Sequence, residues 1–141
     1  MNSQRSPTVS FFRVVLFVHG SRNPEWAIPF EELRERTAKQ LGSKQVRLAY
    51  LEFNTPTLLD IAREASSDGI QTLLVVPLFF GGGQHMRVDV PDLVAEASRE
   101  NQNLDIRTSG PLSEDQVFCD ALLNRVLKLA EPLKEGGSGN G

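Results

Sequence analysis

Short apolar segments alternate with helical patterns along almost the whole chain. Residues 13–18, 46–52, 72–79 and 104–107 are rich in branched and aromatic side chains and have the length of strands. The first and third segments carry apolar residues at successive positions, which is typical of central strands in a parallel sheet that is covered on both faces. The pattern therefore predicts four strands, two of them central.

Between these segments, apolar residues recur every three or four positions, the spacing of one helix face. Prolines and capping residues favour helix starts near Pro29, Thr55 with Pro56, Pro91, and the pair Ser113 and Gln116. We expect the last helix to end before Pro132 and to bury the face formed by Val117, Ala121, Leu122, Val126 and Leu129.

The order of these elements predicts a single α/β domain over residues 11–133. Right-handed crossovers between parallel strands place helices on both faces, which gives a three-layer αβα sheet with flavodoxin-like topology and strand order 2-1-3-4. The polar residues 1–10 are expected to be a disordered N-terminus, and the glycine-rich residues 134–141 a flexible tail.

Composition narrows the classes of function. The chain has 141 residues and a net charge of −3, without the basic stripe of a nucleic-acid-binding protein. The single cysteine, Cys119, excludes an internal disulfide and a Cys-x-x-Cys zinc site, and it fits a reducing, cytoplasmic setting. The apolar run near the N-terminus is interrupted by Arg13 and is too short to span a bilayer, so we expect no membrane partner.

The candidate chemistry lies where the predicted strands end. The two histidines of the chain, His19 and His85, follow the first and third segments, and Glu52 ends the second. Ligands of open α/β sheets bind beyond the carboxyl ends of the strands near the point where the strand order reverses. We therefore expect these three side chains to converge at one edge of the sheet.

The loops around the histidines add possible ligand contacts. Ser21 and Arg22 follow His19, whereas Gly81, Gly82 and Gly83 precede His85 and Arg87 follows it. Taken alone, each of these residues has an ordinary explanation. A histidine can lie at a loop surface, a glutamate can cap a helix or pair with an arginine, glycines can form an ordinary loop, and arginines can be solvated. Their expected convergence at one edge favours a functional site.

Two imidazoles and a carboxylate can hold a divalent metal while leaving coordination positions open. Such a site suits a metal that must pass to another ligand. Consecutive glycines would let a flat molecule approach the backbone, and arginines could bind its acidic groups. A phosphate loop is excluded, because neither Gly-Lys-Ser/Thr nor Gly-x-Gly-x-x-Gly occurs.

Three motifs resemble those of the small class II chelatases, the sirohydrochlorin cobaltochelatases of cobalamin biosynthesis. They read LFVHGSRNPEW, AYLEFNTPTL and VVPLFFGGGQHMRVDVPDL. The resemblance runs in order from about Arg13 into the fourth predicted helix and covers nearly the whole patterned part of the chain.

The resemblance implies ATP-independent insertion of Co²⁺ into sirohydrochlorin, an acidic tetrapyrrole, by a homodimer of short chains. His19 and His85 match the metal-binding histidines, and Glu52 matches the acidic residue near the metal, as ligand or proton acceptor. The metal is a substrate, and no organic cofactor is implied. Related members insert Fe²⁺ for siroheme or Ni²⁺ into another tetrapyrrole.

Two other classes of function remain open at this point. A non-catalytic metal or tetrapyrrole carrier would use the same residues but would not turn over. A phosphohistidine-type phosphatase or mutase also uses two histidines, the first of them in an Arg-His-Gly motif. Here Val18 stands in the place of that arginine, which argues against this class.

Overall fold

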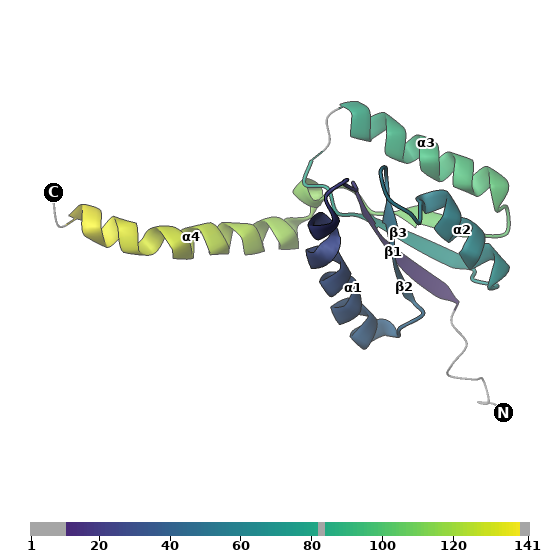
Figure 1. The fold of residues 1–141 in the computed structure, drawn as a ribbon. Helices are drawn as coiled ribbons and strands as arrows, with labels where there is room; N and C mark the ends of the chain where they lie inside the picture. Colours follow the sequence, from purple (N-terminus) through teal and green to yellow (C-terminus); the bar gives the residue numbers. More distant parts are fainter. Residues whose placement is uncertain (1–10, 82–83, 139–141) are drawn as a thin grey trace.

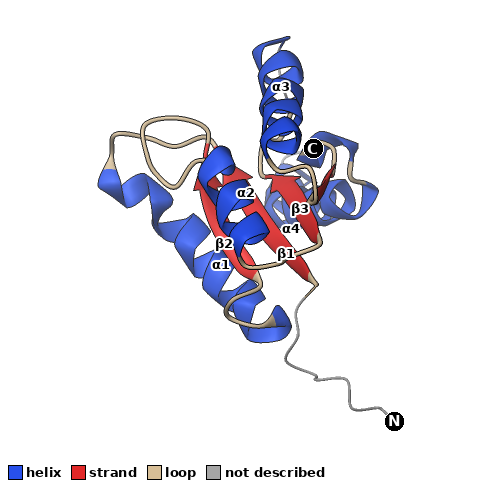
Figure 2. Cartoon of the chain, turned by 90° about the vertical axis from the view of Figure 1, so that its right-hand side faces the viewer, coloured by secondary structure: helices blue, strands red, loops and turns tan. Residues whose placement is uncertain are grey.

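The protein is described by a computed structural model that covers residues 11–81 and 84–138, with the side chains of 84–87, 135, 137 and 138 outside the description. Four parallel strands form one sheet in the order β2-β1-β3-β4 (Figures 1 and 2). The strands are β1 (Phe12–Val18), β2 (Val46–Tyr50), β3 (Thr72–Pro77) and β4 (Asp105–Thr108). The predicted fold class and strand order are confirmed.

The register brings the carboxyl ends of the strands to one edge. Val18 of β1 pairs with Tyr50 of β2, and Phe17 pairs with Pro77 of β3. The residues that follow β1, β2 and β3 therefore leave the sheet side by side. This edge contains the reversal of strand order beside β1, as the sequence predicted.

Helices cover the two faces unequally. Helix α1 (Ile28–Leu41) packs on one face, in a core that includes Val14, Leu16 and Val18. Helices α2 (Leu58–Ser67) and α3 (Gln84–Glu100) pack on the other face, over Val15 and Phe17 (Figure 2). Because both sets of alternating side chains in β1 are buried, this strand is apolar throughout its central part.

The predicted starts of α2 and α3 are wrong in position. Helix α2 begins after Thr57 rather than at Thr55 and Pro56: the Thr57 N–H donates to Asp60 Oδ2 (2.9 Å), and the Asp60 N–H donates to Thr57 Oγ1 (3.2 Å). The hydrogen bond that the Asp60 carboxylate accepts from the Thr57 N–H lowers the pKa of this carboxyl. Helix α3 begins at Gln84, so Pro91 lies inside it rather than opening it. The predicted Pro29 start of α1 is confirmed.

Helix α4 (Gln116–Ser138) differs most from the expectation, because it projects away from the sheet (Figure 1). It follows a short 3-10 turn, η2 (Leu112–Glu114), and Asp115 caps it by accepting a hydrogen bond from the Phe118 N–H (3.0 Å). The predicted capping pair Ser113 and Gln116 is therefore wrong.

The end and the packing of α4 also correct the sequence prediction. The helix continues through Pro132 to Ser138, so residues 134–138 lie in its last turns, and 139–141 and 1–10 lie outside the described residues. The face predicted to be buried is exposed, at Val117, Leu122, Val126 and Leu129 among others. An amphipathic pattern marks a face that needs a partner but does not say which surface provides it.

In the part of the chain that the structure describes, no helix combines the length and apolar character needed to cross a bilayer.

Candidate active site

A histidine and a glutamate meet at the carboxyl edge of the sheet. His19 is the first residue after β1, Glu52 is the second after β2, and His19 Nδ1 lies 3.5 Å from Glu52 Oε2. Each side chain is about half exposed, 45% for His19 and 46% for Glu52. With Nδ1 toward the carboxylate, the other ring nitrogen, Nε2, is left for a ligand. The predicted pairing of His19 with Glu52 is present.

Backbone hydrogen bonds join the two loops that carry this pair. The Leu51 N–H donates to the Val18 carbonyl (2.8 Å), and the Glu52 N–H donates to the His19 carbonyl (3.0 Å). One turn further, the Ser21 N–H donates to Asn54 Oδ1 (2.8 Å). The separation of the histidine and the carboxylate is therefore set by main-chain contacts as well as by their own side chains.

Gly20 is needed for this close contact between the loops. Its φ is +100°, a conformation that residues with a side chain rarely adopt, and a Cβ at this position would overlap the backbone carbonyl of Glu52. The glycine after His19 thus lets the two loops lie against each other.

One aromatic side chain, that of Phe79, contacts the His19 imidazole from the loop after the neighbouring strand. The Phe79 ring follows β3 and lies edge-on to His19, with ring centroids 5.8 Å apart, and it makes a similar contact with Phe17 in the core. Below the edge, burial and then the charge of Glu31 raise the pKa of the Tyr50 phenol, which further favours its neutral form. Phe79 could not be predicted from the sequence as part of the site, because an apolar residue after a strand carries no chemical signal.

Arg22 lies at the rim of the site. Its guanidinium carbon is 4.9 Å from the centroid of the Phe53 ring, a cation–π contact. Phe53 is exposed and has a φ of +70°, which is uncommon for a residue with a side chain. Ser21 Oγ accepts a hydrogen bond from the Asn23 N–H (3.0 Å), which gives Ser21 a part in shaping the loop.

The second predicted histidine lies in the first turn of α3. His85 comes after β3, a neighbour of β1 in the sheet, and its convergence with His19 stays a prediction. Its side chain and that of Arg87 lie outside the described part, as do Gly82 and Gly83. Among the side chains that the structure does describe, no three His, Cys, Asp or Glu groups are placed to hold a metal ion.

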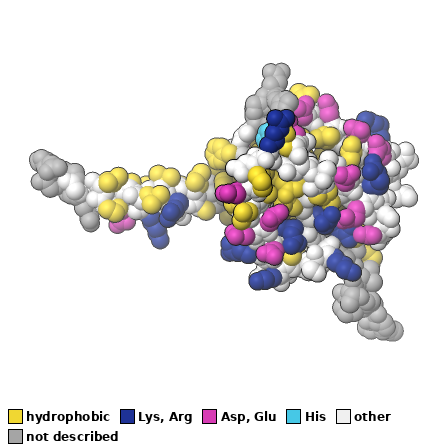
Figure 3. Space-filling model, in the orientation of Figure 1, with side chains coloured by type: hydrophobic (Ala, Val, Ile, Leu, Met, Phe, Trp, Pro, Cys, Tyr) yellow, Lys and Arg dark blue, Asp and Glu magenta, His cyan; other side chains and the backbone are white. Residues whose placement is uncertain are grey.

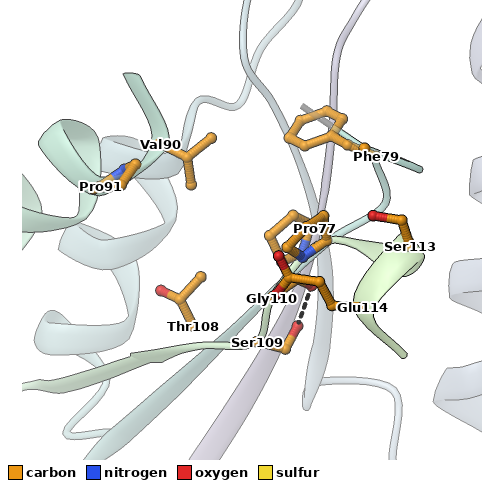
Figure 4. A pocket seen from close by; sticks show the side chains of 11 residues that line it. Pro77, Phe79, Val90, Pro91, Thr108, Ser109, Gly110, Ser113 and Glu114 are labelled. Carbon is orange, nitrogen blue, oxygen red and sulfur yellow. Dashed lines mark hydrogen bonds between the residues drawn. The ribbon is translucent and has the colours of Figure 1, made fainter. Parts of the chain in front are cut away.

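A pocket of about 360 Å³ lies near the carboxyl ends of β3 and β4 (Figure 4). Phe79 and Gly81 line it, so it begins at the residue that contacts the His19 ring. Its other walls mix apolar and polar groups, supplied by Pro77, Val90, Pro91, Thr108, Ser109, Gly110, Pro111, Ser113 and Glu114. Of the predicted glycines, Gly81 is thus placed at a cavity wall.

On the other side of Glu52 lies an acidic hollow of about 380 Å³. Its carboxylates come from Glu52 and from three positions of α3, Asp89, Asp92 and Glu96. These three residues are not among those predicted from the sequence. Their spacing of three and four positions, which places them on one helix face, is the signal that could have found them.

The fold and the site together define an open α/β domain with a solvent-accessible histidine–carboxylate pair at the reversal of its sheet. The CbiX family model matches residues 13–129, which contain the pair, β2, β3, β4 and all of β1 except its first residue. The chain therefore belongs to the CbiX family.

Similar proteins span most of the same length. A protein of Saccharolobus solfataricus named sirohydrochlorin cobaltochelatase is 32% identical over 119 residues, which is 80% of this chain and 91% of that protein. The solved structure of a CbiX protein of cobalamin (vitamin B12) biosynthesis from Marinobacter aquaeolei VT8 superposes with a TM-score of 0.75 at 30% identity, covering 86% of this chain and 98% of the other.

A longer relative also matches. The chloroplastic sirohydrochlorin ferrochelatase of Arabidopsis thaliana is 26% identical over 113 residues, which is 80% of this chain but 50% of that protein. This chain therefore corresponds to about half of the plant protein.

Proposed function

We propose that this protein inserts a divalent metal, Co²⁺ in the cell, into sirohydrochlorin without ATP. The observation that best supports the proposal is the accessible His19–Glu52 pair beside a pocket at the carboxyl edge. Membership of the CbiX family and the names of the relatives agree with it. The metal and the tetrapyrrole are both substrates, and the reaction needs no organic cofactor.

In this proposal His19 binds the incoming metal through Nε2, and His85 supplies the second imidazole. A site with few protein ligands leaves positions on the metal for the ring nitrogens of the tetrapyrrole. As the metal enters, two N–H protons leave the macrocycle. Glu52, next to His19, accepts these two protons one after the other and passes each to solvent, because its carboxylate is half exposed.

The charges around the pair suit the two substrates. The acidic hollow formed by Glu52, Asp89, Asp92 and Glu96 attracts a divalent cation from solvent. Arg22 at the rim, together with Arg87, binds the carboxylates of the tetrapyrrole. Ser21 and the loop Gly81, Gly82 and Gly83 let the flat ring approach the backbone beside His19.

We further propose that two copies assemble to form the complete cleft. This chain matches half of the Arabidopsis protein, so one copy provides one of two lobes. The single cysteine agrees with a location in the reducing cytoplasm.

A metal-panel assay tests this function. Purified protein is mixed with sirohydrochlorin and Co²⁺, Ni²⁺ or Fe²⁺ under anaerobic conditions, and the change in the tetrapyrrole absorbance is followed. We expect insertion above the uncatalysed rate with many turnovers per chain, fastest with Co²⁺. One equivalent of product per chain would instead identify a carrier, and a faster rate with Fe²⁺ or Ni²⁺ would reassign the metal.

The Glu52→Gln variant tests the role of the carboxylate. Glutamine keeps the size of the side chain but cannot accept a proton, so we expect insertion to slow by about 10²-fold. Stability should change little, because the side chain is half exposed. The matched control is Glu35→Gln, an exposed glutamate on the outside of α1, which should retain the wild-type rate. Equal rates in both variants would remove Glu52 from the mechanism.

A further inference from the structure

Phe53 combines an unusual backbone conformation with an exposed ring. Its φ is +70°, in the left-handed region that residues with a side chain rarely adopt, and the residue is 56% exposed. The backbone before it is tied to the loop after β1 by the hydrogen bond from the Glu52 N–H to the His19 carbonyl (3.0 Å). The residue after it is tied to the same loop, because Asn54 Oδ1 accepts a hydrogen bond from the Ser21 N–H (2.8 Å). Phe53 is therefore held between two fixed neighbours in a conformation that is unfavourable for it.

Packing in the core does not explain this conformation. Phe53 is outside both hydrophobic cores of the sheet. Its ring contacts a charged group instead, since the guanidinium carbon of Arg22 lies 4.9 Å from the ring centroid. Unfavourable backbone conformations are concentrated at functional sites, where they help to arrange the groups of the site. The turn at Phe53 thus directs its ring toward the loop that carries Arg22.

Arg22 is exposed, and among the residues that the structure describes no carboxylate forms an ion pair with it. An exposed arginine populates many rotamers and loses this freedom when it binds a carboxylate, which weakens the binding. An aromatic ring against the guanidinium restricts the side chain beforehand. The contact leaves the N–H groups of the planar guanidinium available to bind a carboxylate in pairs. Phe53 therefore lowers the conformational entropy that Arg22 loses when it binds an anion.

The contact between Phe53 and Arg22 lies next to the histidine–carboxylate pair. Arg22 comes three residues after His19, and Phe53 directly follows Glu52. In Figure 3, a histidine and a basic side chain are exposed on the same face of the domain. An anion bound by Arg22 therefore lies at the rim of the proposed site.

We propose that Phe53 is a positioning residue for Arg22. Its ring orders the guanidinium before the substrate arrives, so that Arg22 binds one carboxylate of the tetrapyrrole and fixes an edge of the macrocycle beside His19. This inference rests on the proposed function, in which Arg22 binds that substrate. Its test measures binding of the tetrapyrrole in the absence of metal rather than metal insertion, so the two can fail separately.

The experiment measures the dissociation constant of metal-free sirohydrochlorin for full-length proteins, from the change in its absorbance. Phe53→Leu keeps an apolar side chain but removes the ring, so binding should weaken roughly two- to fivefold, the range of a cation–π contact at an exposed position. Phe53→Tyr keeps the ring and should bind like wild type. The matched control is Phe11→Leu, which changes a phenylalanine of similar exposure, 51%, before β1 at the opposite edge of the sheet. It should also bind like wild type.

A double variant separates positioning of Arg22 from direct contact with the substrate. Arg22→Met removes the charged partner of the carboxylate and should weaken binding at least tenfold. Because Phe53 acts through Arg22, the combination of Arg22→Met with Phe53→Leu should bind no more weakly than Arg22→Met alone.

Each of three results would overturn the role of Phe53. Unchanged affinity in Phe53→Leu would show that the ring does not order Arg22. An equal loss in Phe53→Tyr and Phe53→Leu would show that the aromatic ring is not what matters at this position. A further loss in the double variant would mean that Phe53 contacts the macrocycle itself. A wild type that shows the expected differences in binding but inserts no metal would contradict the proposed function and still support the role of Phe53, whereas a wild type that does not bind sirohydrochlorin would overturn both.

Discussion

Replacing His19 by alanine is expected to reduce insertion of Co²⁺ into sirohydrochlorin by 10²-fold or more, close to the uncatalysed rate. His19 is the described imidazole at the carboxyl edge, and its Nδ1 faces Glu52 at 3.5 Å, which leaves Nε2 for the metal. Because the ring is 45% exposed, its loss should change the free energy of unfolding by less than about 1 kcal/mol. We expect His85→Ala to produce a loss of the same order.

Two measurements separate a role in the reaction from a role in folding. Titration of the protein with Co²⁺, followed by the visible absorption of the metal, should show weaker binding to His19→Ala than to wild type. Gln71→Ala, an exposed position before β3 at the opposite edge of the sheet, should bind and react like wild type. If His19→Ala together with His85→Ala inserts the metal at the wild-type rate, neither histidine holds it.

The Gly20→Ala variant is expected to lose about 2–4 kcal/mol of stability and most of its activity. Two effects add at this position. The φ of +100° is unfavourable for alanine, and the new Cβ would overlap the Glu52 carbonyl, which forces the loops after β1 and β2 apart. Moving these loops separates His19 from Glu52, so activity should fall even at temperatures where the variant is folded. Urea unfolding and the insertion assay measure the two losses.

Gly69 provides the matched control. Its φ is also positive, at +77°, but a Cβ there would meet no atom within 4 Å. Gly69→Ala should therefore lose only about 1 kcal/mol, from backbone strain, and should keep its activity. Equal losses of stability in the two variants would show that the overlap of the new Cβ with the Glu52 carbonyl does not add to the loss in Gly20→Ala.

Much of the site could be predicted from the sequence because it follows from the topology. In a parallel sheet, the residues that follow neighbouring strands must emerge at the same edge, so the positions of His19 and Glu52 after two strands were enough to predict their meeting. What could not be predicted is the support of the pair. The Phe79 contact and the bond from the Ser21 N–H to Asn54 depend on loop geometry, for which an apolar or amide side chain gives no distinct signal.

Helix starts were predicted less well than strands. Proline and a polar cap are compatible with a helix beginning nearby, but the backbone can also include a proline inside a helix, as at Pro91 of α3 and Pro132 of α4. At α2, the capping box formed by Thr57 with Asp60 sets the first residue. Alternative first residues of a helix differ little in the free energy of the folded chain, so tertiary packing decides between them.

The order of apolar and polar residues by itself determined the class of fold, the strand order and the edge at which the chemistry lies, because burial of alternating faces and the handedness of crossovers allow few other arrangements. The position of α4, in contrast, depends on contacts that form in the folded chain. The apolar side chains of α4 could pack on any apolar surface, so the sequence pattern does not predict which surface they contact. The hydrogen bonds that hold residues 109–115 at the carboxyl edge point the helix away from its own sheet.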